Sequence, residues 1–194
     1  GYEAGVFDAI VGEPLLETAV ELARFAREQP CGAVIGVGGG SAMDMAKLAA
    51  AFAANTGEVR DYLGVVTFPR PPLPLALVPT TAGTGSEATP VAIITTGETT
   101  KAGVSSPVLL PDVAVLDAAL TLGLPPAVTA MTGVDAMVHA IEAYTSRHKK
   151  NPLSDNLALQ ALHLLSRNIR TAVHEGGNRQ AREHMLLGAC LAGQ

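Results

Sequence analysis

The residues with the clearest chemical potential are an aspartate and a histidine, Asp135 and His139, four positions apart. In an α-helix this spacing places both side chains on one face. A carboxylate and an imidazole on one face offer two ligands to a single divalent metal. The alternative is a neutral histidine that is hydrogen-bonded to the aspartate within a helix bundle. The neighbours are apolar, so we expect the segment to be largely buried: Val134, Met137, Val138 and Ile141.

A second candidate site is the glycine turn, residues 38–40, which follows a short apolar run and precedes an Ala- and Met-rich segment. A strand, a glycine turn and a helix in this order let the free N–H groups at the helix start approach a phosphate. The spacing departs from the usual dinucleotide fingerprint because position 41 is serine. The alternative is a tight turn closed by a capping box of Ser41 and Asp44.

A third candidate is the threonine loop, residues 80–87, which reads Thr-Thr-Ala-Gly-Thr-Gly-Ser-Glu and also follows an apolar run. It gathers hydroxyl groups and flexible backbone at the carboxyl end of a predicted strand, where open α/β sheets bind ligands. Taken alone, such a cluster is more often a plain loop. Two loops of this kind after two strands indicate a ligand site more strongly than either one.

The other basic side chains give weaker signals. Lys47 is interpreted as a surface residue whose aliphatic stem lies along apolar neighbours. Lys101 lies in a predicted hairpin, from which its side chain could reach a ribose or a phosphate. The remaining histidines are interpreted as solvated rather than as ligands: His148, His163, His174 and His184.

The framework that positions these residues changes character along the chain. Helical spacing predicts helices over residues 14–29 and 41–54, and apolar runs predict strands over 33–37, 75–78, 91–95, 101–105 and 113–116. The proline-rich residues 55–74 are predicted to form a loop. Beyond residue 120 the pattern predicts helices alone, over 129–145 or 132–145, 153–174 and 179–192.

Composition narrows the class of protein. The chain has 194 residues, a net charge of −5 and 48% hydrophobic residues, which excludes intrinsic disorder. The acidic balance argues against nucleic acid or an anionic membrane as the main partner, and no apolar run has the roughly 18 residues of a membrane helix. Two cysteines, Cys31 and Cys190, make no disulfide framework, so we expect a reducing compartment, the cytoplasm.

Three motifs together resemble a known family. Gly38-Gly39-Gly40-Ser41-x-x-Asp44-x-Ala46-Lys47 resembles the glycine motif of the iron-containing (group III) alcohol dehydrogenases. Residues 79–87 resemble the second motif of that family. Leu124-Pro125-Pro126 with residues 132–144 resembles its metal-binding helix. The matches follow the family order across essentially the whole chain.

The resemblance implies an α/β dinucleotide-binding domain over residues 1–120, followed by an all-helical metal-binding domain over 121–194. It implies NAD or NADP, a divalent metal (iron or zinc), and a homo-oligomeric enzyme that interconverts a small alcohol and its aldehyde. Asp135 and His139 would be the catalytic metal ligands. The cofactor-binding residues would be Gly39, Gly40, Ser41, Asp44, Thr80, Thr81, Ser86, Lys101 and Leu120.

The chain also departs from the family pattern. The family metal has four protein ligands, and the two later histidines would lie beyond Gln194, so we expect the chain by itself to be inactive. The first strand and helix of the family are absent, so the fold is expected to be incomplete at both ends. Gly12-Glu13-Pro14 stands where relatives often carry Asn between two prolines. Two alternatives remain: a relative acting on a polyol, hydroxy acid or phosphorylated substrate, and a nucleotide-binding remnant without activity.

Overall fold

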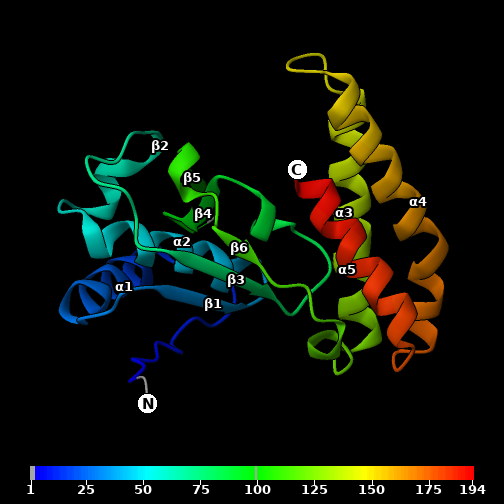
Figure 1. Cartoon of the computed structure of the whole chain (residues 1–194), viewed down its shortest axis with the longest axis horizontal. Coiled ribbons are helices and arrows are strands. Elements are labelled where there is room, and N and C mark those ends of the chain that lie inside the picture. Colours follow the sequence, from blue (N-terminus) through cyan, green and yellow to red (C-terminus); the bar gives the residue numbers. More distant parts are fainter. Residues whose placement is uncertain (1–2, 99) are drawn as a thin grey trace. The chain divides into compact units, whose positions relative to one another are not determined.

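The computed structural model describes residues 3–98 and 100–194 of the chain (Figure 1). Contacts within the chain divide it into two compact units. The α/β unit comprises Gly1–Val37, Ser41–Leu77 and Pro90–Ala114, and the helical unit comprises Gly38–Gly40, Val78–Thr89 and Val115–Gln194. The glycine turn and the threonine loop therefore belong with the helices, although both follow strands in the sequence.

Two helices and six short strands of the described residues lie wholly or mainly in the α/β unit. The helices are α1 (Leu16–Glu28) and α2 (Gly40–Ala54). Two 3₁₀ turns, η1 (Val59–Tyr62) and η3 (Pro107–Leu109), precede β2 and β6, respectively. The strands are β1 (Val34–Gly38), β2 (Gly64–Val65), β3 (Leu75–Pro79), β4 (Val91–Thr95), β5 (Lys101–Ser105) and β6 (Val113–Ala114).

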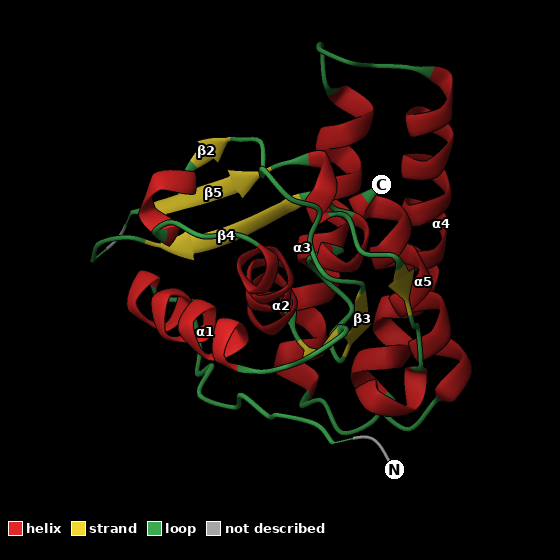
Figure 2. Cartoon of the chain, turned by 60° about the vertical axis from the view of Figure 1, so that its left-hand side comes forward, coloured by secondary structure: helices red, strands yellow, loops and turns green. Residues whose placement is uncertain are grey.

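The strands form two separate sheets. One has the order β1-β3-β6, with β3 and β6 parallel, and the other has the order β2-β5-β4 (Figure 2). Strands β4 and β5 pair antiparallel, with Val91 opposite Ser105 and Thr95 opposite Lys101, which confirms the predicted hairpin. The prediction of a loop over residues 55–74 is wrong in part, because β2 pairs with β5.

Strand β1 lies at one end of its sheet order, and β3 is its neighbour in the part of the chain that the structure describes. Two of its large apolar side chains face outward: Ile35 is 70% exposed and Val37 is 56% exposed. Gly36, between them, is buried, since a Cβ there would lie 2.5 Å from the Ala46 side chain of α2. One face of β1 is therefore packed on α2 and the other is open.

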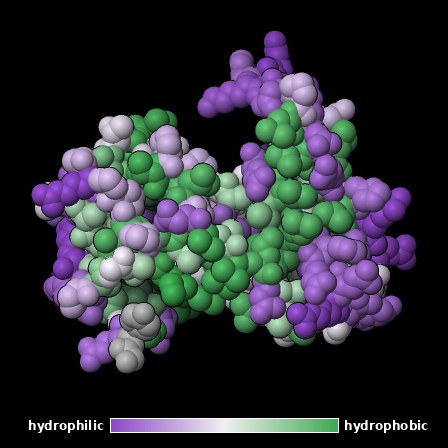
Figure 3. All heavy atoms as spheres, in the orientation of Figure 1, coloured by the Kyte–Doolittle hydropathy of each residue, from purple (hydrophilic) through white to green (hydrophobic). Residues whose placement is uncertain are grey.

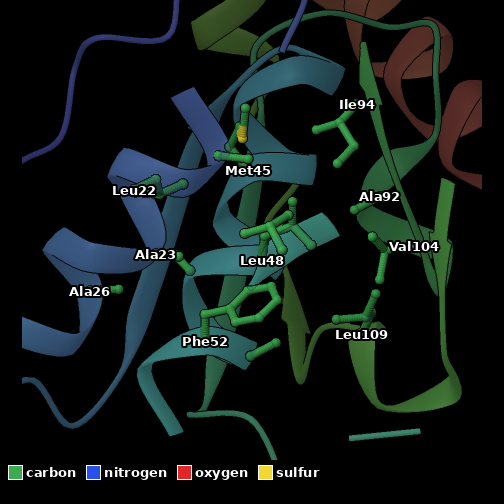
Figure 4. Close-up of a cluster of buried hydrophobic side chains, with 14 of the residues drawn as sticks. Leu22, Ala23, Ala26, Met45, Leu48, Phe52, Ala92, Ile94, Val104 and Leu109 are labelled. Atoms are coloured by element: carbon green, nitrogen blue, oxygen red, sulfur yellow. The ribbon is translucent and has the colours of Figure 1, made fainter. Parts of the chain in front are cut away.

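The apolar core of the α/β unit is built around α2. Figure 4 shows Met45, Leu48 and Phe52 of α2 lying between α1 and the β4–β5 hairpin. The facing side chains come from both of these elements: Leu22, Ala23 and Ala26 of α1, and Ala92, Ile94 and Val104 of the hairpin. The opposite side of α2 packs Ala46 and Ala50 against Leu75 and Leu77 of β3. Helix α2 is therefore covered on two sides, which explains its all-round apolar sequence.

A buried ion pair ties α2 to the hairpin. Lys47 is fully buried, so the interpretation of this residue as a surface lysine is wrong. Its Nζ lies 3.1 Å from Asp44 Oδ1 and donates to the Val91 carbonyl at 2.6 Å, while Asp44 Oδ2 accepts from the Ile93 N–H at 2.9 Å. The Asp44 carboxylate thus joins two elements far apart in sequence, a role that the capping box did not predict.

The helical unit contains three long helices, α3 (Pro126–Thr145), α4 (Pro152–His174) and α5 (Arg179–Gly193), and the 3₁₀ turns η2 (Ser86–Ala88) and η4 (Ala118–Thr121). Asn151 and Asn178 cap α4 and α5 by accepting from backbone N–H groups of the first turn. Small residues dominate the contacts between the helices: Ala136, Ala140, Ala158, Ala161 and Ala189 are buried. Helix α3 begins at Pro126, earlier than either predicted start.

A buried arginine links the start of α5 to the start of α3 through hydrogen bonds. Arg182 of α5 is 2% exposed, and burial lowers the pKa of its guanidinium. It donates to Thr129 Oγ1 at 2.7 Å and to the carbonyls of Gly176 and Leu124. Neutral acceptors from α3, from the turn before α3 and from the turn between α4 and α5 thus surround one charged group.

The surface of the helical unit is divided between polar and apolar regions. The connector between α3 and α4, with exposed His148, Lys149 and Lys150, projects as a hydrophilic group at the top of Figure 3. His163 and His174 are also exposed on α4, as predicted. Within the described residues, no helix combines the length and apolar character needed to span a membrane.

Replacing Lys47 by Met tests the buried pair. The variant keeps much of the side-chain volume but leaves the Asp44 carboxylate buried without its cation, so we expect a loss of about 3 kcal/mol in the free energy of unfolding. Denaturant unfolding measures this loss. The matched control is Arg179→Ala, which removes an exposed ion pair with Glu183 and should change stability by less than about 0.5 kcal/mol. Equal stability of the two variants would contradict the assignment.

Candidate functional site

The glycine turn is shaped by the threonine loop. The Thr80 N–H donates to the Gly38 carbonyl at 2.8 Å, so the two segments leave their strands side by side. A Cβ on Gly40 would lie 2.7 Å from the Thr84 methyl, whereas a Cβ on Gly39 would lie an ordinary 3.5 Å from Thr81 Oγ1. Gly40 is therefore a position where packing itself requires glycine.

The helix that follows the turn suits an anion. Helix α2 starts at Gly40 with no acidic residue in its first turn, so its first N–H groups carry uncompensated partial positive charge. Ser41 lies half-buried in this turn, and Asp44 lies beyond it, engaged with Lys47. A glycine turn without side chains, followed by a long helix, is suited to bind the pyrophosphate of a dinucleotide.

The threonine loop presents some hydroxyls and buries others. Thr80 and Thr81 are half-buried and Thr84 is exposed, with Thr84 Oγ1 accepting from the Ser86 N–H at 3.2 Å. Ser86 is buried, at 3% exposure. Gly85 has a positive φ of 62°, which glycine adopts without strain.

The metal pair, Asp135 and His139, lies on α3 as predicted. His139 Nε2 is 3.7 Å from Asp135 Oδ1, which is longer than a hydrogen bond. The Asp135 side chain is 46% exposed and the His139 side chain is 38% exposed, so the expectation of a buried segment is wrong. Helix α3 packs inward through Gly133, Ala136 and Ala140, and leaves large apolar neighbours of the pair exposed: Val134, Val138 and Ile141.

The donor set of the pair fits a divalent metal in part. A carboxylate oxygen and an imidazole nitrogen are ligands that zinc and iron accept. Across residues 3–98 and 100–194 no group of three or more His, Cys, Asp or Glu side chains gathers to hold a metal. The pair could therefore supply at most two of the ligands that a metal site needs.

The threonine loop rests on the same helix as the metal pair. A Cβ on Gly83 would lie 2.8 Å from the Thr132 Cβ and 3.0 Å from its carbonyl oxygen. Thr132, Asp135 and His139 follow helical spacing and share one face of α3. The loop thus touches Gly40 through Thr84 and the metal helix through Gly83. The sequence did not predict a role for Thr84 or Thr132, because their contacts with Gly40 and Gly83 arise only from packing.

Two other predicted cofactor residues lie outside this contact. Lys101 Nζ forms a 2.6 Å ion pair with Glu13, and Thr95 Oγ1 donates to the same carboxylate. These hydrogen bonds from Lys101 and Thr95 lower the pKa of the exposed Glu13 carboxyl. Leu120 is partly exposed in η4, whose first turn is capped by Asp117. Glu13, which departs from the family pattern, is therefore paired with Lys101, and the sequence did not predict this ion pair.

Comparison with known proteins defines the class. The family model described as "Iron-containing alcohol dehydrogenase" matches residues 1–118, and "Fe-containing alcohol dehydrogenase family, C-terminal" matches residues 129–194. The chain belongs to the iron-containing alcohol dehydrogenase family. This confirms the resemblance and the predicted fold class, an α/β part followed by a helical part.

The most similar proteins include enzymes with different named substrates. The chain is 49% identical to long-chain-alcohol dehydrogenase 1 of Geobacillus thermodenitrificans, over 100% of this chain and 49% of that protein. It is 43% identical to sulfoacetaldehyde reductase of Bilophila wadsworthia, over 93% of this chain and 47% of that protein. A sulfoacetaldehyde reductase from Bifidobacterium kashiwanohense, solved in complex with NAD+, matches with a TM-score of 0.91 at 36% identity, over 98% of this chain and 51% of that one. The chain spans about half the length of the curated relatives it matches.

The contact between Gly83 and Thr132 yields a stability prediction. Gly83→Ala places a methyl group against the backbone of α3, so we expect the free energy of unfolding to fall by about 1–3 kcal/mol. Thermal or denaturant unfolding measures the change. Gly123→Ala, where a Cβ meets no atom within 4 Å, is the control and should leave stability nearly unchanged. A Gly83→Ala variant as stable as this control would show that the loop does not rest on α3.

Proposed function

We propose that this chain is the cofactor-binding and metal-binding part of a metal-dependent, NAD(P)-linked alcohol dehydrogenase, in which hydride passes between an alcohol and the nicotinamide. The observation that carries the proposal is the placement of the threonine loop. One of its residues, Thr84, packs on the turn suited to pyrophosphate, and another, Gly83, packs on the helix with the metal pair. Family membership and a relative solved with NAD+ support the same function.

Each cofactor-binding residue has a distinct part in this proposal. Backbone N–H groups of Gly39, Gly40 and Ser41 bind the pyrophosphate, because bare amides at a helix start attract phosphate. Asp44 contributes indirectly, since its carboxylate is held by Lys47 and the Ile93 N–H and so fixes the first turns of α2. The remaining residues line the cofactor: Thr80, Thr81, Ser86, Lys101 and Leu120.

Asp135 and His139 hold the metal through a carboxylate oxygen and the imidazole Nε2. When bound, the metal would lower the pKa of the alcohol hydroxyl and the nicotinamide would accept the hydride. Because His139 Nε2 and Asp135 Oδ1 lie 3.7 Å apart on one face of α3, both atoms are close enough to bind one cation. Iron is the family metal, and zinc accepts the same two donors.

The substrate is proposed to be a small alcohol or its aldehyde. Charge gives no reason to favour a phosphorylated substrate near the metal pair, because the exposed neighbours Val134 and Val138 are apolar. We further propose a domain boundary near residue 120, a homo-oligomeric state and a cytoplasmic location. Cys31 and Cys190 are both free thiols, which supports a reducing compartment.

NADH titration tests the cofactor assignment. Gly40→Val places a branched side chain where Thr84 and the pyrophosphate approach, so we expect the NADH dissociation constant to rise at least about tenfold. Fluorescence of bound NADH measures this constant. Gly32→Ala, with open space around its Cβ, is the control and should bind like the parent chain. If the folded Gly40→Val variant bound NADH as tightly as the control, the pyrophosphate assignment would be wrong.

Metal binding tests the second half of the proposal. Two ligands cannot close a four-coordinate site, so the 194-residue chain by itself should bind Zn²⁺ or Fe²⁺ weakly. His139→Ala should weaken equilibrium metal binding further and leave NADH affinity unchanged, because the two groups use different side chains. His163→Ala, on exposed α4 surface, is the matched control. Tight stoichiometric metal in the His139→Ala variant would overturn the assignment of the pair.

A further inference from the structure

We propose that the last turn of α5 positions the threonine loop for cofactor binding. Gly193 and Cys190 are the positioning residues. This inference rests on the proposed function, because the loop must bind a dinucleotide for its position to matter. Neither residue belongs to the motifs that identify the family in this sequence. Both lie at the end of α5, more than one hundred positions from the loop they contact.

The first support is a backbone-to-backbone contact. A Cβ on Gly193 would lie 2.5 Å from the Gly85 carbonyl oxygen and 3.0 Å from the Gly85 Cα. In the reverse direction, a Cβ on Gly85 would lie 2.8 Å from the Ala189 carbonyl oxygen. Since main-chain atoms cannot rotate away as the end of a side chain can, any larger residue on either side forces the loop off the helix.

The second support is polar and lies one helical turn away. Cys190 and Glu87 are both buried, at 7% and 3% exposure, respectively. Burial, the negative charge of Glu87 and a hydrogen bond to Glu87 raise the pKa of the Cys190 thiol to about 12, so the thiol stays protonated and donates to the carboxylate. The end of the loop is thus held to α5 by a hydrogen bond as well as by packing.

The consequence for the cofactor follows from the order of residues in the loop. Thr84, which packs on Gly40, lies directly before Gly85, and its hydroxyl accepts from the Ser86 N–H, directly after it. A displacement of Gly85 by a few tenths of an ångström therefore moves the residue that borders the pyrophosphate turn. The contact of Gly85 with α5 sets the position of Thr84, while the contact of Gly83 with Thr132 holds the other side of the loop against α3.

The decisive experiment compares NADH affinity across α5 variants of this chain. Gly193→Ala and Cys190→Ala should each raise the NADH dissociation constant about tenfold, whereas Cys190→Ser, which keeps a donor for Glu87, should stay within about threefold of the parent chain. Melting temperatures without ligand are recorded in parallel. A merely structural role would lower the melting temperature and leave NADH affinity unchanged in the folded protein, which would overturn the inference.

Two controls separate the inference from general damage to α5. Gly177→Ala adds a Cβ in open space at the turn before α5, and Leu187→Ala truncates an exposed side chain on it, so both should bind NADH like the parent chain. If the parent chain itself fails to bind NADH, the proposed function fails and the inference fails with it. If the parent binds and the Gly193→Ala and Cys190→Ala variants match it, the inference alone fails.

Hydrogen exchange of the parent chain decides the question even if the variants do not fold. NADH should slow amide exchange in residues 83–87 and in the last turn of α5 together, because the two segments are in contact. Protection of the loop without protection of α5 would overturn the inference.

Discussion

The helical unit depends on one steric constraint, the absence of room for side chains on either side of the threonine loop. Gly40, Gly83, Gly85 and Gly193 each lie where a Cβ would come within 3 Å of another segment. A loop of this kind gains its fixed shape from neighbours that fill the space around it rather than from its own side chains. The loop thus keeps Thr80 and Thr81 partly exposed and Thr84 exposed, while Ser86 is buried.

The α/β unit relies on a different principle, a buried charge pair between Lys47 and Asp44. Packing around α2 is almost entirely apolar, and small residues such as Ala46 and Ala50 give it little directional preference. The Lys47–Asp44 pair adds direction, because the Val91 carbonyl and the Ile93 N–H satisfy it only in one register of the hairpin. An apolar pair of the same size would fill the space without fixing that register.

The local sequence pattern was sufficient to predict most helices and strands, but it did not predict which of their side chains are buried or which strands pair. The helix α1, the hairpin of β4 and β5, and helix α4 were predicted closely, because periodicity and turn residues decide them locally. The spacing of Asp135 and His139 likewise predicted their shared face. Three features could not be predicted, since each depends on partners distant in sequence: the burial of Lys47, the exposure of Val134 and Val138, and the pairing of β2 with β5.

The open edge of β1 bears on how this polypeptide behaves in solution. A strand at the end of its sheet order with outward-facing Ile35 and Val37 is a template on which another strand can add. Such an edge favours association between copies at high concentration, and no lysine or proline within β1 opposes it. Handling the chain at low concentration, or placing a charged residue at position 35, would suppress that self-association and keep binding measurements free of aggregates.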